Sequence, residues 1–197
     1  MRFNFLTPRN SRLPQVAVIA VAALFLGAIP TYGQNILELH SSAANLIANN
    51  HGKVLVLLFV RTDCPISNRY APLIQQMSKQ YGQAASFQLV FPDRKQSQET
   101  IKEFLNDYHY QLPAIRDMDH VLTKKAFVKV TPEAAVFDLK GALVYHGRID
   151  NLYEHIGQAR SVATTHELAD AVDAAIKGVK VQSPAVDGVG CFIADLE

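Results

Sequence analysis

The fold is decided by residues 54–72, which read VLVLLFVRTDCPISNRYAP. The first seven residues are all apolar, which is typical of a strand buried on both faces within a sheet. A helical pattern begins directly after Cys64, because Ile66, Tyr70 and later apolar residues recur on one helix face. Pro65 suits the first position of a helix. The stretch therefore predicts a buried strand that leads into a helix, with Cys64 at the junction.

The remaining pattern predicts an α/β domain. The long helix is expected to continue past an internal Pro72 and to stop at Gly82. The first strand is expected at 53–60, and further strands are expected at 87–91, 112–115, 134–137 and 143–149. The last two are expected to form a hairpin across Asp138–Gly141. Further helices are expected at 42–49, after a cap at Ser97, over 119–127, and after a capping box formed by Thr164 and Glu167. Such alternation of strands and helices is typical of an α/β sheet.

The N-terminal 33 residues have the pattern of a secretory signal peptide. Three arginines, Arg2, Arg9 and Arg12, precede an apolar stretch at 16–26, and small residues follow. We therefore expect an exported protein, periplasmic or otherwise extracytoplasmic, with no stable membrane anchor after cleavage. The alternative is a permanent N-terminal anchor. The expected organisation is a signal peptide at 1–33, one domain at 34–177 and a C-terminal tail at 178–197 that carries Cys191.

Composition excludes several function classes. Without the three leader arginines, 16 basic residues face 18 acidic ones, a balance that does not attract nucleic acid. The seven histidines form no HxxH or HExxH pattern, so we expect no metal site. A glycine-rich phosphate loop is also missing, so we expect no cofactor. The two cysteines, Cys64 and Cys191, would be exported to a compartment where disulfides persist.

At this point the chain resembles a thioredoxin-fold protein. The resemblance is carried by the strand at 53–60, Cys64 at the next helix start, Pro72 within that helix, and Val130–Thr131–Pro132 before the strand at 134–137. It implies a central mixed sheet with helices on both faces and a helical insert before the strand that follows a cis-proline. In that family this proline packs against the active-site sulfur, which implies a functional role for Pro132. Its backbone neighbours would pair with an extended partner chain.

Within that superfamily, the chain looks like an exported redoxin of the alkyl hydroperoxide reductase/thiol-specific antioxidant type, in a subgroup that ends in a Gly–Cys tail, as Gly190–Cys191 does here. Two departures matter. The usual thioredoxin site is Cys-x-x-Cys preceded by Trp, whereas Asp63 and Ser67 stand at the Trp and second Cys positions. The usual peroxiredoxin Thr and Pro are replaced by Arg61 and Leu57. Neither chemistry carries over intact.

Cys64 is the candidate nucleophile. The positive end of a helix dipole stabilises a thiolate, so its pKa should fall, provided that the sulfur is reachable. Arg61 would lower the pKa further and Asp63 would raise it, which leaves the net shift open. Ser67, one helical turn on, would donate a hydrogen bond to the thiolate but cannot resolve a mixed disulfide. The alternatives are an inert buried cysteine and an ordinary first-turn serine.

Cys191 is the candidate resolving thiol. The tail is long enough to reach across the domain, since 13 residues extend up to roughly 43 Å. Three interpretations remain open: a thiol that cycles with Cys64, a static disulfide with Cys64, or a free or intermolecular thiol. Gly188 and Gly190 favour a mobile tail and hence the first interpretation.

Three functions follow from these interpretations. The leading hypothesis is a thiol–disulfide oxidoreductase in which Cys64 attacks a client disulfide and Cys191, or an external thiol, resolves the product. Its partners would be a disulfide- or thiol-bearing client protein and an external thiol reductant. The second is a peroxidase in which Cys64 forms a sulfenic acid that condenses with Cys191. The third is a non-catalytic binding module with a permanent Cys64–Cys191 bridge.

Overall fold

The structure is a computed structural model, which describes residues 36–38, 43–48, 50, 52–194 and 196. The predicted signal peptide at 1–33 lies outside the described residues. The helices are α1 (Ala43–Ala48), α2 (Pro65–Tyr81), α3 (Gln98–Asp107), α4 (Val121–Lys125) and α5 (Glu167–Lys177). The strands are β1 (Ile36–Glu38), β2 (Val54–Phe59), β3 (Ala85–Phe91), β4 (Ala114–Arg116), β5 (Val130–Thr131), β6 (Glu133–Phe137), β7 (Leu143–Gly147), β8 (Tyr153–His155), β9 (Gln158–Ala159), β10 (Ala185–Val186) and β11 (Cys191–Phe192).

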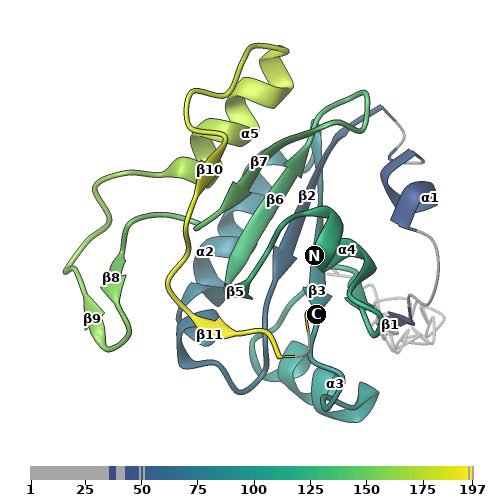
Figure 1. Ribbon diagram of the computed structural model, residues 1–197, viewed down its shortest axis with the longest axis vertical. Helices are drawn as coiled ribbons and strands as arrows, with labels where there is room; N and C mark the ends of the chain where they lie inside the picture. Colours follow the sequence, from purple (N-terminus) through teal and green to yellow (C-terminus); the bar gives the residue numbers. More distant parts are fainter. Residues whose placement is uncertain (1–35, 39–42, 49, 51, 195, 197) are drawn as a thin grey trace, which may run out of the picture. The chain divides into compact units, whose positions relative to one another are not determined.

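The central sheet is mixed, as predicted. Its seven strands have the order β1-β4-β3-β2-β6-β7-β10. Strand β2 lies in the middle, parallel to β3 and antiparallel to β6, and all six of its residues are buried (Figure 1). A continuous apolar run is what a central strand covered on both faces requires. The order of a β-α-β half followed by an antiparallel hairpin and a helix confirms the predicted fold class.

Both faces of the sheet are covered by helices. Side chains alternate along a strand, so β2 contributes to two hydrophobic clusters. Val54, Val56 and Leu58 pack in one cluster with residues of α2, α3 and α5. Leu55, Leu57 and Phe59 pack in the other with residues of α1 and α4. In Figure 1, α4 lies in front of the sheet and α2 behind it.

Helix α2 agrees closely with its prediction. Cys64 is its N-cap residue, Pro65 is its first residue, Pro72 lies inside it, and Gly82 follows its end. The face that carries Ile66, Tyr70, Ile74 and Met77 is buried, which is the expected apolar stripe. The junction of strand and helix at Cys64 is therefore confirmed.

The helical insert before the proline strand is also confirmed, although its second helix begins later than predicted. Helices α3 and α4 both lie between β3 and β5. Ser97 caps α3 as expected, because its Oγ accepts the N–H of Thr100 at 3.2 Å. The helix predicted from Asp119 begins at Val121 instead, and hydrogen bonds to Asp117 stabilise its first turn. The buried Asp117 carboxylate accepts the N–H groups of Val121 and Thr123, each at 2.8 Å.

The predicted capping box of α5 is wrong. Thr164 Oγ1 accepts a hydrogen bond from Asn151, and the residue at the N-cap, His166, makes no side-chain cap. The Glu167 carboxylate instead accepts hydrogen bonds from Arg148 and from Thr165 Oγ1. The guanidinium is a charged donor and outcompetes a backbone N–H for this carboxylate.

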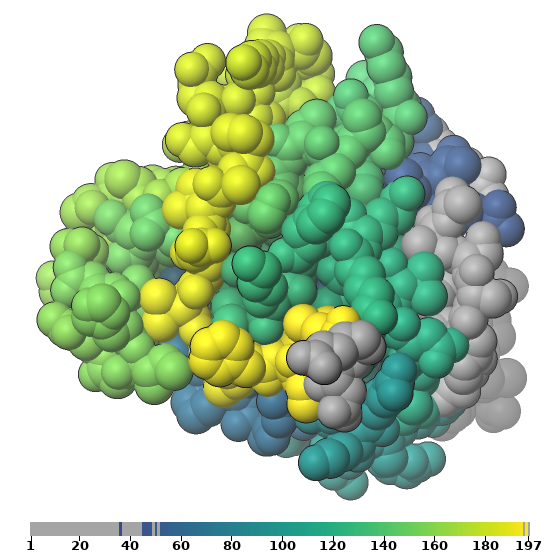
Figure 2. All heavy atoms as spheres, in the orientation of Figure 1, coloured from purple at the N-terminus to yellow at the C-terminus, as the bar shows by residue number. Residues whose placement is uncertain are grey.

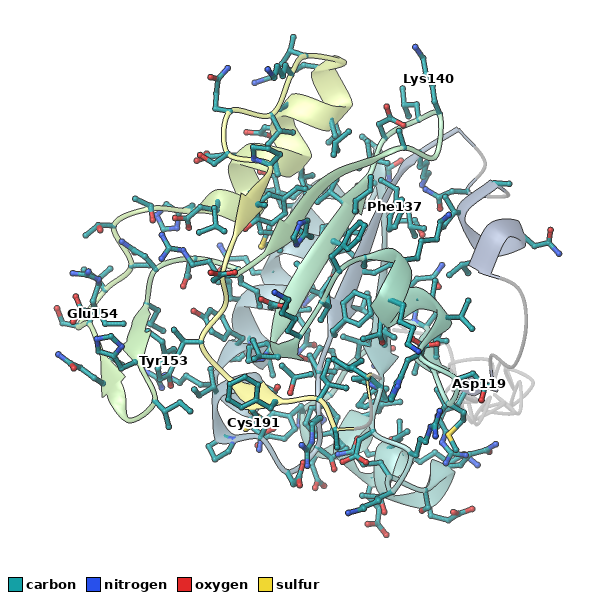
Figure 3. All side chains as sticks on the ribbon, in the orientation of Figure 1. Asp119, Phe137, Lys140, Tyr153, Glu154 and Cys191 are labelled. Carbon is teal, nitrogen blue, oxygen red and sulfur yellow. The ribbon has the colours of Figure 1, made fainter. Side chains whose placement is uncertain are left out.

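The tail after α5 pairs with two strands of the domain. Strand β10 pairs in parallel with β7 at the sheet edge, and β11 pairs antiparallel with β5. Figure 2 shows the tail, in yellow, running over the surface of this face. In Figure 3, Cys191 lies on the tail, while Tyr153 and Glu154 lie on the separate hairpin of β8 and β9. The pairing of β11 with β5 is what positions the site.

Candidate functional site

Cys64 lies where β2 gives way to α2. Its carbonyl accepts the N–H of Asn68 at 3.0 Å, the first hydrogen bond of the helix. Its thiol donates to the carbonyl of Thr131 on β5 at 3.2 Å. The side chain is 0% exposed. The expectation of a reachable sulfur is therefore wrong for this structure, because the tail, with Cys191 at its inner side, closes the approach to Cys64.

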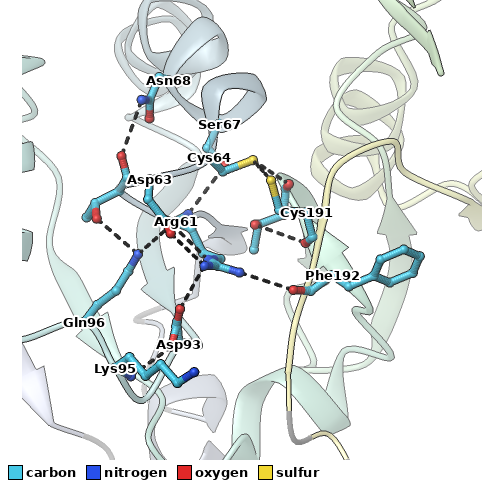
Figure 4. Close-up of polar contacts among 12 residues, drawn as sticks. Arg61, Asp63, Cys64, Ser67, Asn68, Asp93, Lys95, Gln96, Cys191 and Phe192 are labelled. Carbon is cyan, nitrogen blue, oxygen red and sulfur yellow. Dashed lines mark hydrogen bonds and ion pairs between the residues drawn. The ribbon is translucent and has the colours of Figure 1, made fainter. Parts of the chain in front are cut away.

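Cys191 contacts Cys64 directly. The two sulfurs are 2.7 Å apart although the residues are separated by 127 positions, and both are free thiols (Figure 4). The register of β11 explains the contact, because Cys191 pairs with Thr131, whose carbonyl also holds Cys64. Cys191 is partly exposed, so it is the outer member of the pair.

The two thiols have opposite pKa shifts. Burial alone would raise the pKa of Cys64, but hydrogen bonds from the Cys191 thiol and from the N–H and hydroxyl of Ser67 outweigh it and lower that pKa. Burial and the neighbouring Cys64 raise the pKa of Cys191 to about 11. The arrangement stabilises a thiolate on Cys64 with a protonated Cys191 beside it.

Ser67 lies in the first turn of α2, three residues after Cys64. It is 0% exposed, and its Oγ accepts the N–H of Arg61 at 3.4 Å. A hydroxyl that accepts from the backbone on one side is oriented to donate on the other, toward the Cys64 thiolate. The structure thus brings Ser67 to Cys64 as a hydrogen-bond donor in the first turn of α2.

Arg61 is engaged by two carboxylates beside Cys64. Arg61 forms ion pairs with Asp63 at 2.8 Å and Asp93 at 3.1 Å. Its Nη1 also donates to the carbonyl of Phe192 at 3.3 Å, which ties the Cys64 loop to the tail (Figure 4). Burial opposes a thiolate at Cys64, and the hydrogen bonds from Cys191 and Ser67 lower its pKa.

Pro132 follows β5 directly, and the Thr131–Pro132 peptide bond is cis, as the resemblance implied. The tail occupies the edge of β5 at this point, where the sequence analysis expected a partner chain. Two hydrogen bonds extend the pairing: Thr131 Oγ1 donates to the carbonyl of Cys191 at 3.4 Å, and the N–H of Ile193 donates to the carbonyl of Lys129 at 3.0 Å.

Glu133 is a site residue that the sequence analysis missed. It is only 5% exposed, at the start of the fully buried strand β6. One carboxylate oxygen accepts the N–H of Lys129 at 3.0 Å, and the other accepts the N–H of Gly188 at 2.9 Å. The available signal was an acidic residue between Pro132 and an apolar strand, since a buried carboxylate needs hydrogen-bond partners.

The tail glycines have a different role from the expected one. A Cβ at Gly190 would lie 2.0 Å from the carbonyl oxygen of Thr131, and a Cβ at Gly188 would lie 2.6 Å from Cγ of Glu133. The sequence analysis interpreted both glycines as a source of mobility. In the structure they allow the tail backbone to approach β5 and β6 closely.

Other site types receive no support from the described part of the chain. It contains no group of three or more His, Cys, Asp or Glu side chains placed to hold a metal ion. None of its helices combines the length and the apolar character that a membrane crossing needs.

Comparison with known proteins agrees with the fold described above. Residues 52–143 match a family model described as thioredoxin-like. A hypothetical protein from Sinorhizobium meliloti 1021 has a similar structure, with a TM-score of 0.64 and 24% identity over 75% of this chain and 82% of its own. An uncharacterized conserved protein from Geobacillus kaustophilus has a TM-score of 0.63 and 21% identity over 72% and 77%.

A secreted disulfide oxidoreductase from Mycobacterium tuberculosis is more distant, with a TM-score of 0.45 and 18% identity over 67% of this chain and 86% of its own. No curated protein is similar enough in sequence to count as a match. At these identities the structural likenesses establish the fold and leave the activity open. The chain has a thioredoxin-like fold, and its residues 52–143 form a thioredoxin-like domain.

Proposed function

We propose that this protein is an extracytoplasmic thiol–disulfide oxidoreductase in which Cys64 is the nucleophile and Cys191 the resolving thiol. The observation that carries the proposal is the 2.7 Å contact between the two sulfurs, with a lowered pKa at Cys64 and a raised one at Cys191. A thiolate beside a protonated thiol is the starting state for attack followed by resolution. The predicted signal peptide at 1–33 supports export.

The reaction has two exchange steps. With the tail displaced, the Cys64 thiolate attacks one sulfur of a client disulfide, forms a Cys64–client bond and releases the other client sulfur as a thiolate. Cys191 then loses its proton to that leaving thiolate and attacks Cys64, which forms the Cys64–Cys191 disulfide and frees the second client thiol. The client gains two electrons and the protein loses them. An external thiol reductant restores the two thiols.

Three neighbouring residues support these steps. Ser67 donates to the Cys64 thiolate and stabilises it both before attack and as a leaving group. Pro132 holds the end of β5 beside Cys64, where an extended client segment would pair with the backbone. Arg61 fixes the loop that precedes Cys64 through its two ion pairs.

The geometry favours this function over the two alternatives. A peroxidase needs donors free to hold the peroxide, but the guanidinium of Arg61 is engaged by Asp63, Asp93 and the carbonyl of Phe192. A static binding module would keep Cys64 and Cys191 permanently bridged, whereas exchange requires a bridge that forms and is reduced again.

Glutathione disulfide provides the test. The reduced protein should acquire the Cys64–Cys191 disulfide and release two glutathione thiols, as measured by mass spectrometry. Cys191→Ser should stop at one glutathione bound to Cys64, and Cys64→Ser should react far more slowly. The proposal fails if the wild-type protein keeps two free thiols, or if Cys64→Ser reacts as fast as the wild type.

A further inference from the structure

We propose that the edge of β5 that pairs with the tail is a binding surface for an extended client segment containing Gly–Cys, and that the tail occupies this surface as a substitute within the same chain. This inference rests on the proposed function, because the client sulfur must meet Cys64. It adds the class of client segment that the site accepts and the position of the tail as its competitor. We call residues 130–131 with the following Pro132 the client edge.

The tail is seated on the client edge as an antiparallel strand. Cys191 pairs with Thr131 and Phe192 pairs with Val130. The carbonyl of Lys129 extends the pairing by accepting the N–H of Ile193 at 3.0 Å. This is β-augmentation, in which main-chain hydrogen bonds supply the affinity and side-chain positions supply the selectivity.

A client must take the place of the tail to reach Cys64. The sulfur of Cys64 is fully buried, and its contacts outside α2 are the carbonyl of Thr131 on one side and the sulfur of Cys191 on the other. The only one of these that can leave without opening the core is Cys191, since Thr131 is itself 0% exposed. A client sulfur that replaces Cys191 lies directly against the nucleophile. The position of Cys191 therefore defines where the client cysteine binds.

The residue before that cysteine must be glycine. A Cβ at position 190 would lie 2.0 Å from the oxygen and 2.6 Å from the carbon of the Thr131 carbonyl, and 3.1 Å from the nitrogen of Pro132. All three atoms belong to the backbone at the end of β5, where Thr131 is 0% exposed. A side chain at this position cannot be accommodated by rotating a flexible neighbour, so any larger residue pushes the segment away from the client edge.

The next two positions differ in their demands. Phe192 is 76% exposed, so the position directly after the cysteine restricts the side chain little. Ile193 is 7% exposed and packs in the cluster with Leu122 and Val128, so the second position after the cysteine prefers an apolar side chain. The client segment that fits is therefore Gly–Cys, then any residue, then an apolar residue.

The test uses the full chain with Cys191→Ser, which keeps the tail and leaves Cys64 as the reacting thiol. The probes are the peptides Val–Gly–Cys–Phe–Ile and Val–Ala–Cys–Phe–Ile, each joined through its cysteine to thionitrobenzoate by a disulfide. The Cys64 thiolate attacks the peptide sulfur, forms the Cys64–peptide bond and releases thionitrobenzoate, whose absorbance gives the rate. Mass spectrometry identifies the adduct. We expect the glycine peptide to react about tenfold faster or more, because overpacking at a rigid backbone is costly.

Two further peptides map the other positions. Replacing Phe by Ser after the cysteine should change the rate less than twofold, whereas replacing Ile by Asp should slow it severalfold. Both expectations follow from the exposures of Phe192 and Ile193. Equal sensitivity at the two positions would contradict the inferred register.

The competition by the tail is tested by adding Gly190→Ala to Cys191→Ser. The added methyl group should push the tail off the client edge, so that both peptides react faster while the preference for glycine remains. Gly157→Ala is the control for general backbone strain away from the client edge, because Gly157 has a φ of +80° while a Cβ there would meet nothing within 4 Å. If Gly190→Ala does not fold, the peptide ratio in Cys191→Ser alone still decides the selectivity.

The outcomes separate this inference from the proposed function. Should glutathione disulfide modify Cys64 while the glycine and alanine peptides react equally fast, the inference is wrong and the proposed function stands. Should neither glutathione disulfide nor any peptide modify Cys64, the proposed function itself fails. An unchanged rate on adding Gly190→Ala in a folded protein would show that the tail does not compete for the client edge.

Discussion

The Glu133 carboxylate accepts the backbone N–H of Gly188 at 2.9 Å, which fastens the tail to the strand that follows Pro132. Its other oxygen accepts the N–H of Lys129 at 3.0 Å, just before β5. One buried side chain thus connects the tail to the segment on which the tail is seated. Charged acceptors form the stronger hydrogen bonds, worth about 1.5–3 kcal/mol each.

Glu133→Gln should therefore loosen the tail. The amide keeps one oxygen acceptor but turns an NH₂ group toward a backbone N–H, so one of the two connections is lost. Cys191 in the reduced protein should be alkylated by iodoacetamide about tenfold faster, as the loss of one such hydrogen bond implies. Glu154→Gln on the β8–β9 hairpin is the matched control and should leave the alkylation rate unchanged. Equal rates for Glu133→Gln and the wild type would rule out this connection.

The sequence is most informative where a pattern is local. The run at 54–60 has no polar side, so it can only be a strand covered on both faces, and Pro65 after Cys64 determines where α2 begins. The hairpin at 134–149 is likewise specified by two short strand-like runs on either side of the turn at Asp138–Gly141. These local features were enough to predict the fold class and the place of Cys64.

The unpredicted features depend on partners far away in the chain. Strands β10 and β11 have two residues each, too few for any periodicity. The pairing of β10 with β7 depends on close backbone approach at Gly147, and that of β11 with β5 on close approach at Gly190. The burial of Cys64 follows from this pairing. The predicted cap of α5 was wrong for a similar reason. Arg148, which follows β7, donates to the Glu167 carboxylate.

Ser67→Ala should weaken the thiolate at Cys64. The substitution removes the hydroxyl that helps to lower the pKa of Cys64, so less thiolate is present at neutral pH. Exchange with glutathione disulfide should slow by roughly tenfold, the value of one hydrogen bond to a charged group. Ultraviolet thiolate absorbance against pH should show the Cys64 transition at higher pH than in the wild type. Ser78→Ala, whose Oγ donates to the carbonyl of Gln75 in the same helix, is the control. A transition that does not move would exclude this role of Ser67.

Asp117→Ala should lower the free energy of unfolding, because Asp117 stabilises the first turn of α4. The 0% exposed carboxylate accepts the N–H groups of Val121 and Thr123 and also the Thr123 hydroxyl at 2.7 Å. Loss of a helix cap costs about 0.5–2 kcal/mol, and the upper end applies to a fully buried cap. Urea unfolding monitored by circular dichroism should show this loss in the free energy of unfolding. Asp107→Ala, an exposed carboxylate at the end of α3, should show none. A midpoint for Asp117→Ala equal to that of the wild type would contradict the assigned cap.

The pH dependence of the reduced protein should carry the signature of both thiols. Cys64 has a pKa below its ordinary value of 9.0 when folded, so its contribution to stability is full above pH 9.0 and is lost as pH falls through the lowered pKa. Cys191 has the opposite shift, to about 11, so its contribution is present below its ordinary value of 9.0 and is lost as pH rises toward 11.

Between the lowered pKa of Cys64 and pH 9.0, stability relative to Cys64→Ser should therefore rise with pH. Relative to Cys191→Ser, stability should fall above pH 9.0. Urea unfolding under reducing conditions across this range measures both slopes. If the stability difference between the wild type and Cys64→Ser did not change with pH, folding would leave the proton affinity of Cys64 unchanged. The proposed mechanism would then have no stabilised thiolate.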